Sequence, residues 1–246
     1  MKILVHGSTG RMGKILCELL CAGYNGLELA ARVSPEETSD SANCIYTSLQ
    51  EVDCQVDGVI DFSHHTAVGS LMDFCTAKNL PVVVATTGHT AEEKAIIAEA
   101  AKKIPVFFSA NMSIGVALLA ELAKKAASVF PEANIEIVEK HHNQKLDVPS
   151  GTALLLAHRI QEALTDTVLL VGRHENGKRT AKEIGIHSLR LGNEVGTHEI
   201  IIATGAETIT LKHEAENRSL FANGALAAAK FLEGKPAGIY SMKNII

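Results

Sequence analysis

The sequence lacks the long apolar stretches that a membrane protein needs. The longest apolar runs, such as residues 81–85 and 153–157, are far too short to cross a bilayer, which takes about 20 residues. The first residues read as a strand that runs into a glycine turn, not as a secretory signal. We therefore expect a soluble, cytoplasmic protein that does not associate with membranes.

The sequence also lacks the cysteine spacings of a disulfide framework or a zinc site. Its cysteines are odd in number, lie in the first third of the chain and include no Cys-x-x-Cys pair. They are Cys17, Cys21, Cys44, Cys54 and Cys75. We expect small buried side chains or free thiols in a reducing compartment.

An excess of positive charge is missing too. The chain carries 23 Lys and Arg against 28 Asp and Glu, a net charge of -5. This balance predicts no general attraction to nucleic acid or to anionic membranes, although it leaves room for a local basic pocket. With 246 residues, 46% of them hydrophobic, the chain can fold as one large domain or two modest ones.

The first hundred residues alternate short apolar runs with helical stretches. The apolar runs show no period-2 alternation, which is typical of parallel strands buried on both faces. The predicted strands are 2–6, 27–33, 58–62, 81–85 and 105–109, and the predicted helices are 12–22, 66–78 and 91–103. The pattern predicts a Rossmann-like, doubly wound parallel sheet.

After about residue 113 the pattern changes to that of an α+β domain. A helix at 114–130 precedes a strand at 135–139, a polar loop and a second helix from Gly151. Three strands are then predicted between residues 184 and 213. Their links are too short for crossover helices, so we expect a mixed or antiparallel sheet.

These patterns divide the chain into two predicted domains. Residues 1–112 form the dinucleotide-binding domain, completed by 217–246, which include a predicted helix at 221–232. Residues 113–216 form the domain for substrate binding and oligomerisation.

A glycine turn from Gly7 to Gly13 follows the first strand and opens the first helix. Glycine allows the backbone angles of such a turn and lets a pyrophosphate approach the N–H groups at the helix start. The spacing is G-x-x-G-x-x-G instead of G-x-G-x-x-G, so a turn without a ligand remains an alternative.

The second strand has no acidic residue at the position that usually binds the ribose of NAD. Arg32 and Ser34 lie there instead and could contact the 2′-phosphate of NADPH. Alternatively, Arg32 is an ordinary solvated side chain, and Glu36 or Glu37 reaches back. We expect NADPH, NADH or both as cofactor, with NADPH favoured.

The densest group of reactive side chains lies between Glu139 and Ala153. Ser150 is a natural N-cap, which leaves helix N–H groups and a partial positive charge where a carboxylate can dock. His142 and Lys145 add donors, and imidazole exchanges protons near neutral pH.

The residues of this loop allow three other interpretations. A metal site is disfavoured because no carboxylate or thiolate stands at a familiar zinc spacing, and we expect no metal. A serine nucleophile is disfavoured because the G-x-S-x-G elbow is missing. A solvated turn without function is the remaining alternative.

From His141 to Ala153 the loop reads His-His-x-x-Lys-x-Asp-x-Pro-Ser-Gly-Thr-Ala. In this motif the sequence resembles the dihydrodipicolinate reductases of bacterial diaminopimelate and lysine synthesis. Other motifs follow in the expected order over nearly the whole chain. They are residues 7–13, 61–63, 86–88 and 110–113, Arg190, Gly192, Gly196, His198, and residues 221–225 and 238–242.

The resemblance implies NAD(P)H-dependent reduction of a small dicarboxylate, 4-hydroxy-tetrahydrodipicolinate, by a homotetramer. It implies His141 as general acid/base and Lys145 as a second proton donor. The substrate-binding residues would be His142, Ser150, Gly151 and Thr152. The cofactor-binding residues would be Gly7, Ser8, Thr9, Gly10, Arg11, Met12, Ala85, Thr86, Thr87, Ser109, Ala110, Asn111 and Met112, beside Arg32 and Ser34.

One departure from the family pattern is Ala85, where glycine usually precedes Thr-Thr-Gly. The backbone approach to the nicotinamide is therefore expected to differ slightly. Two other functions are alternatives: a different two-domain dehydrogenase of amino-acid metabolism, acting on homoserine or aspartate, and a dinucleotide sensor without turnover.

Overall fold

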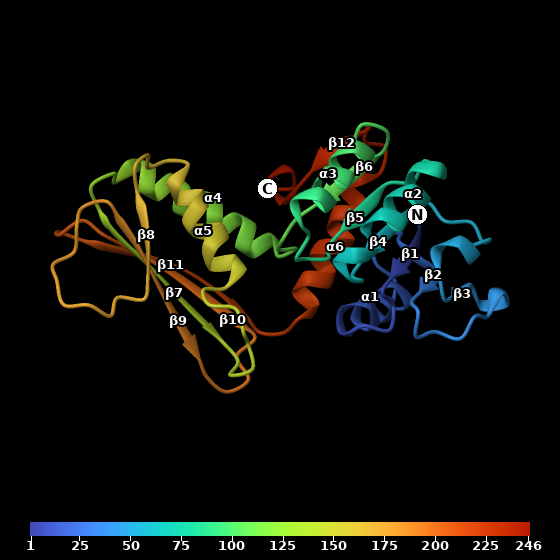
Figure 1. The fold of residues 1–246 in the computed structure, drawn as a ribbon, viewed down its shortest axis with the longest axis horizontal. Helices are drawn as coiled ribbons and strands as arrows, with labels where there is room; N and C mark the ends of the chain where they lie inside the picture. Colours follow the sequence, from blue (N-terminus) through green and yellow to red (C-terminus); the bar gives the residue numbers. More distant parts are fainter. The chain divides into compact units, whose positions relative to one another are not determined.

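The structure, a computed structural model, describes all residues 1–246 and divides the chain into two units (Figure 1). Unit 1 comprises Met1–Ser113 and Ser219–Ile246, and unit 2 comprises Ile114–Arg218. The chain thus leaves unit 1 once and returns to it for its last 28 residues.

Unit 1 is built on a seven-stranded sheet in which every strand pair is parallel. The strand order is β12-β6-β5-β4-β1-β2-β3. The strands are β1 (Lys2–His6), β2 (Glu28–Val33), β3 (Ile45–Tyr46), β4 (Gly58–Asp61), β5 (Val82–Val84), β6 (Pro105–Phe108) and β12 (Gly238–Tyr240). The order proceeds outward from β1 in both directions, which confirms the doubly wound prediction.

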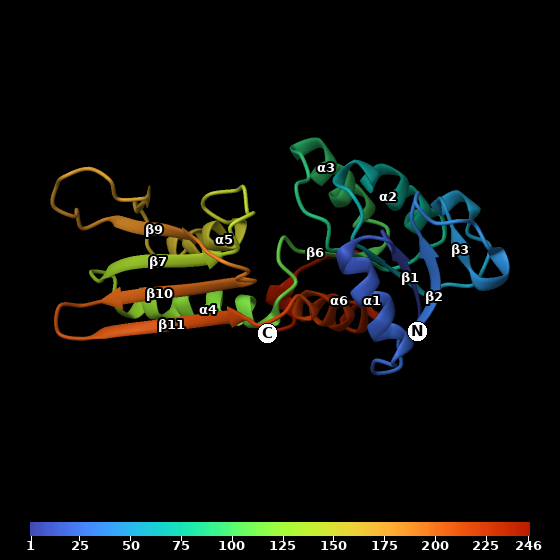
Figure 2. The same ribbon diagram turned by 90° about the horizontal axis from the view of Figure 1, so that it is seen from below.

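Helices cover both faces of this sheet. They are α1 (Arg11–Cys21), α2 (Val68–Ala77), α3 (Ala91–Ala100) and α6 (Ser219–Leu232), with the short 3₁₀ helices η1 (Ser41–Asn43), η2 (Leu49–Glu51), η3 (His65–Ala67) and η4 (Met242–Asn244). Figure 2 shows α2 and α3 on one side of the sheet and α1 and α6 on the other.

The side chains of each strand alternate between these two layers. Leu4 and Val59 pack into the core that contains α2 and α3. Phe107 points to the opposite face, where its ring contacts Phe231 of α6 at 6.2 Å between centroids. Both faces are therefore buried, which explains why the apolar runs lack a period-2 pattern.

Helix α6 packs directly on backbone at Gly224. A Cβ added there would lie 1.6 Å from the carbonyl oxygen of buried Met112. We expect Gly224→Ala to lower the free energy of unfolding by about 1–3 kcal/mol, because the helix must shift away from Met112. Urea denaturation measures the change.

The matched control is Gly69→Ala in α2, where nothing lies within 4 Å of an added Cβ. Alanine is favoured over glycine in helices by about 1 kcal/mol, so this variant should be neutral or stabilised. Equal loss of stability in both variants would contradict close packing at Gly224.

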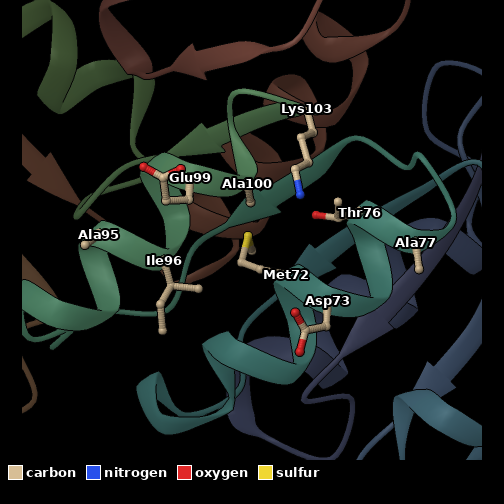
Figure 3. Close-up of a pocket in the computed structure, with 9 residues that line it drawn as sticks. All are labelled: Met72, Asp73, Thr76, Ala77, Ala95, Ile96, Glu99, Ala100 and Lys103. Carbon is tan, nitrogen blue, oxygen red and sulfur yellow. The ribbon is translucent and has the colours of Figure 1, made fainter.

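An open groove of about 570 Å³ lies between α2 and α3 (Figure 3). Met72 and Ala100 lie along it, with Asp73, Glu99 and Lys103 at its sides. It contains none of the predicted site residues.

Unit 2 has a five-stranded mixed sheet in the order β11-β10-β7-β9-β8. The strands are β7 (Asn134–His141), β8 (Val168–Val171), β9 (Glu183–Arg190), β10 (Gly196–Ala203) and β11 (Thr208–Ala215), and the helices are α4 (Ile114–Val129) and α5 (Gly151–Gln161). Strand β10 pairs antiparallel with β7 and β11, whereas β9 pairs parallel with β7 and β8.

The prediction of a mixed or antiparallel sheet is therefore confirmed in its mixed form. Strands β9 and β10 are joined by a short link, but they are not neighbours because β7 lies between them. Strand β8 was not predicted from the sequence.

The two faces of the second sheet differ. Ile135, Ile137 and Ile200 pack against α4 and α5 in an apolar core. The opposite face, which carries Glu136 and Ile201, is covered by no helix of unit 2 (Figure 2). None of the helices is long and apolar enough to cross a membrane.

Candidate active site

The polar loop predicted from the sequence lies between β7 and α5. His141 is the last residue of β7, and Ser150 is the N-cap of α5. The Ser150 hydroxyl accepts a hydrogen bond from the N–H of Ala153 at 3.2 Å, as expected of a capping serine. Gly151 and Thr152 form the first residues of α5, so this end presents helix N–H groups.

A fully buried carboxylate, Glu139, connects the parts of this loop. It accepts hydrogen bonds from Nδ1 of His141, from both terminal nitrogens of Arg190 (2.9 and 2.8 Å) and from the N–H of Ser150 (3.2 Å). Sequence reasoning assigned Glu139 no role. The available signal was its position: the alternation along β7 places it on the buried face with Ile135 and Ile137.

Burial raises the pKa of Glu139, but hydrogen bonds from His141 and Arg190 outweigh it and hold the pKa well below its usual range. The ionised carboxylate can only accept hydrogen bonds, so Nδ1 of His141 donates to it. Nε2 is then the nitrogen available to a ligand. A Cβ at Gly196 would lie 3.0 Å from this atom, so glycine there leaves room beside it.

A second buried imidazole, His198, lies edge-on to His141 with 5.2 Å between ring centroids. Its Nε2 is 3.2 Å from the Ser150 hydroxyl, and its Nδ1 has no hydrogen-bond partner. Burial, with a further contribution from His141, lowers the pKa of His198 to about 3. His198 is therefore neutral at physiological pH.

This imidazole should make the fold sensitive to acid. Unfolding returns the pKa of His198 to its ordinary value of 6.5, so the unfolded chain binds a proton that the folded chain refuses. The unfolding free energy is therefore highest above pH 6.5, where the imidazole is neutral in both states, and it falls as the pH drops from 6.5 toward 3. We expect the unfolding free energy to fall by about 1 kcal/mol between pH 6.5 and 5.5, and by about 1.4 kcal/mol per pH unit further below.

Urea denaturation of the wild type and His198→Gln at pH 6.5, 6.0 and 5.5 measures this slope. The variant should show a shallower slope, because glutamine does not titrate. Parallel slopes in the two proteins would show that His198 is not the group responsible.

Lys145 lies in a turn of the same loop. Its N–H donates to the carbonyl of His142 at 3.2 Å, and its ammonium is 2.8 Å from a carboxylate oxygen of Asp147. Burial raises the pKa of Asp147, but the hydrogen bond and the charge of Lys145, together with backbone hydrogen bonds, outweigh burial and hold the pKa below its usual value. Arg190 donates to the carbonyl of Asp147 at 2.7 Å, which ties this turn to Glu139.

Unit 2 thus brings together the N-terminus of α5, the ammonium of Lys145 and the imidazole of His141, which Glu139 fixes by a hydrogen bond. A carboxylate would find charge-assisted donors here, and Nε2 of His141 could exchange a proton. No group of three or more His, Cys, Asp or Glu side chains in the chain is arranged to hold a metal ion.

The predicted cofactor residues lie in unit 1, where the glycine turn is tightly packed. Gly7 has a φ of +82°, and a Cβ there would lie 2.6 Å from the carbonyl oxygen of Phe62. A Cβ at Gly13 would lie 2.1 Å from the carbonyl oxygen of Gly7. Gly10 caps α1 without a side chain, and the first turn of α1 has no acidic residue. This backbone suits an approaching phosphate.

Beside the turn, two acids reach back toward the end of β2. Glu37 accepts hydrogen bonds from Arg32 at 3.1 and 2.9 Å and from the Ser8 hydroxyl at 2.9 Å. Glu36 accepts from Ser34 at 2.5 Å and from Thr9 at 2.9 Å. Those hydrogen bonds lower the pKa of Glu36, which keeps it ionised.

A cavity of about 280 Å³ adjoins Arg32 and Glu37. Its lining residues are Ser8, Thr9, Lys14, Cys17, Glu18, Arg32 and Glu37. The structure therefore pairs Arg32, whose side chain is 38% exposed, with Glu37, and both Glu36 and Glu37 turn back toward the end of β2.

The remaining cofactor candidates follow β5 and β6. Ala85, Thr86 and Thr87 come directly after β5, and Ser109–Met112 come directly after β6. Thr86 donates to buried Asp61 at 2.6 Å, and Asp61 also bonds Nδ1 of His6 at 2.8 Å. All candidates lie at the carboxyl edge of one parallel sheet, where such sheets bind ligands.

Two family models match the chain. The model described as the N-terminus of dihydrodipicolinate reductase matches residues 1–112, and that of its C-terminus matches residues 115–246. The chain belongs to the dihydrodipicolinate reductase family.

Relatives in this family cover the whole chain. The 4-hydroxy-tetrahydrodipicolinate reductase of Clostridium tetani is 42% identical over 98% of this chain and 95% of that protein. The enzyme of the same name from Caldanaerobacter subterraneus is 43% identical over 100% of this chain and 98% of its own length.

Among solved structures, the fold matches a dipicolinate-bound dihydrodipicolinate reductase from Paenisporosarcina sp. TG-14. The TM-score is 0.83 with 26% sequence identity, covering 100% of this chain and 99% of the other. The predicted pairing of a doubly wound sheet with an α+β domain is thus the fold of the dihydrodipicolinate reductases.

Proposed function

We propose that the chain catalyses NAD(P)H-dependent reduction of 4-hydroxy-tetrahydrodipicolinate to tetrahydrodipicolinate, the activity named for its relatives at 42–43% identity. One observation carries the proposal: His141, Ser150 and the Lys145 loop, all parts of the family motif, are bonded to one another through the Glu139–Arg190 pair. A sensor without turnover needs donors for its ligand, but it does not need an imidazole fixed for proton transfer.

The substrate is a cyclic dicarboxylate that loses water and takes up a hydride and a proton. When bound, the nicotinamide cofactor supplies the hydride. In the proposed mechanism the start of α5, at Ser150, Gly151 and Thr152, binds one carboxylate through its N–H groups, and His142 assists. The ammonium of Lys145 leaves the carboxylate of Asp147 and binds this same substrate carboxylate.

The proton comes from His141 in this proposal. Glu139 holds Nδ1, so Nε2 is the atom that faces a ligand and transfers the proton to the ring. Such general acid catalysis contributes about 10²–10⁴-fold in rate. Lys145 is the second proton donor.

Family membership supports NAD(P)H as the cofactor. The sequence favours NADPH through Arg32 and Ser34, but each of these side chains is bonded to an acid, Glu37 or Glu36. A 2′-phosphate would have to displace these carboxylates. We therefore propose that both cofactors are used and that Glu37 sets the balance between them.

The partner we propose for unit 2 is another copy of the chain, in a cytoplasmic homotetramer. Support comes from the family resemblance and from the open sheet face, where apolar Val138 and Ile201 alternate with Glu136, Glu199 and Lys212. Sedimentation velocity distinguishes a tetramer from the 26.2 kDa monomer.

The proposed reaction is tested by the absorbance of NADPH and NADH, with substrate generated in situ by dihydrodipicolinate synthase. We expect oxidation that depends on the synthase product. Folded protein that binds cofactor without oxidising it in this assay would refute the assignment and favour a sensor. Oxidation with homoserine or aspartate semialdehyde instead would favour a different dehydrogenase.

A further inference from the structure

We infer that Glu139 and Arg190 form the positioning pair of the active site, acting on the reaction through His141 and not on the substrate directly. The inference rests on the proposed function and adds two residues to it. Neither was assigned a role from the sequence.

The first support is the number of separate parts that one carboxylate holds. Glu139 is completely buried, and its two oxygens accept from the end of β7, from the N-cap residue of α5 and from β9. Movement of this carboxylate would therefore disturb the imidazole of His141 and the anion-binding start of α5 together.

The second support is the fork of Arg190. Its two terminal nitrogens bind both oxygens of Glu139, and they also donate to the carbonyls of Leu189 and Asp147 at 2.8 and 2.7 Å. A planar guanidinium can make all of these bonds at once, whereas lysine provides a single point charge. Arg190 thus fixes the orientation of Glu139 and the position of the Lys145 turn.

The parallel register of β7 and β9 creates this arrangement. His141 lies opposite Arg190 in that register, and Glu139 lies two residues earlier on the same face of β7. The carboxylate therefore lies between the guanidinium and the imidazole, where it bonds both.

Removing the charge of Glu139 should reverse the hydrogen-bond pattern. In Glu139→Gln an amide NH₂ replaces one oxygen, and it cannot accept a hydrogen bond from His141 or Arg190. Arg190, which donates to both oxygens of Glu139, then competes with the imidazole for the one oxygen left. The imidazole loses the charged acceptor that selects its tautomer, a change that costs about 10⁴-fold in kcat in the serine-protease triad. We expect a loss of about 10²-fold or more in kcat here, with cofactor affinity unchanged because the cofactor residues lie in unit 1.

The double variant separates positioning from a structural role. If Glu139 acts through His141, then adding Glu139→Gln to His141→Gln lowers kcat by less than twofold further, since residues that act as one unit are not additive. The solvent deuterium isotope effect on kcat should also rise in Glu139→Gln, as proton transfer becomes slower. Damage to the fold alone would produce neither result.

The milder variant Arg190→Lys keeps the fold testable if Glu139→Gln is unstable. It retains the cation but loses the fork, so we expect a loss of about 10-fold in kcat that also vanishes in the His141→Gln background. The matched control is Glu121→Gln in unit 2, which breaks a carboxylate–guanidinium pair with Arg159 that holds no histidine. Its kcat should match that of the wild type.

Two outcomes would overturn the inference: wild-type kcat in Glu139→Gln and Arg190→Lys, or losses that multiply with that of His141→Gln. Failure of the proposed function is distinct, because the wild type itself would then not oxidise NAD(P)H with the synthase product.

Discussion

Replacing His141 with glutamine should lower kcat by about 10²–10⁴-fold and leave the affinity for NADPH and NADH unchanged. The size is that of a positioned general acid. Glutamine preserves much of the size and polarity of the side chain but cannot carry the proton. Cofactor affinity should persist because His141 belongs to unit 2, whereas the predicted cofactor residues belong to unit 1. Steady-state kinetics and fluorescence titration with cofactor measure the two quantities.

Lys145→Ala should also lose most of its turnover, with a higher KM because the ammonium binds the substrate carboxylate. The control is His174→Gln, a histidine of unit 2 whose side chain is 78% exposed and lies outside the site. Unchanged turnover in both His141→Gln and Lys145→Ala would rule out the assigned roles. Loss in His174→Gln as well would point to general instability of unit 2.

The parts of the fold that the sequence predicts are those whose signals are local. Long apolar strands and their helices were recognised because each buries a whole face. Strands β3 and β12 were not predicted because neither lies in an apolar run, unlike β5, which is as short as β12 but lies within the apolar stretch 81–85. Strands β7, β9 and β10 were predicted, but the position of β7 between β9 and β10 was not, because strand order depends on pairing across the whole of unit 2.

The same distinction applies to the site. Ser150 was recognised as an N-cap because capping depends on residues within one helical turn. The bond between Glu139 and Arg190 joins residues 51 positions apart, and only the register of β7 and β9 brings them together. The one local sign was Glu139 itself, a charged residue on the buried face of β7, which requires a partner of opposite charge.

Glu36 and Glu37 illustrate a feature that local sequence patterns do not predict, because the chain after β2 turns back on itself. The usual ribose-binding position carries no acid, yet Glu36 and Glu37 both return to the end of β2 through bonds with Ser34 and Arg32. The sequence left this return open as an alternative, because the path of a turn after a strand is set by contacts beyond it.

The hydrogen bonds between Glu37 and Arg32 lead to a prediction about cofactor preference. Glu37→Gln should raise the ratio of kcat/KM for NADPH over NADH by about 10–100-fold. The change removes a negative charge that would repel a 2′-phosphate, and it releases Arg32 to bind that phosphate. A hydrogen bond to a charged group contributes about 1.5–3 kcal/mol, and every 1.4 kcal/mol is tenfold. Cofactor-dependent kinetics in the coupled assay give the ratio directly.

Arg32→Gln provides the opposite test, since it removes the cation but keeps both acids. Its ratio should fall below that of the wild type, and in the double variant Arg32→Gln/Glu37→Gln the gain of the single Glu37 variant should largely vanish. A gain that persists without Arg32 would mean that charge repulsion alone sets the preference. No change in either single variant would place the adenosine ribose away from the cavity beside Arg32 and Glu37, and the cofactor site would then have to be sought elsewhere on the carboxyl edge of the sheet.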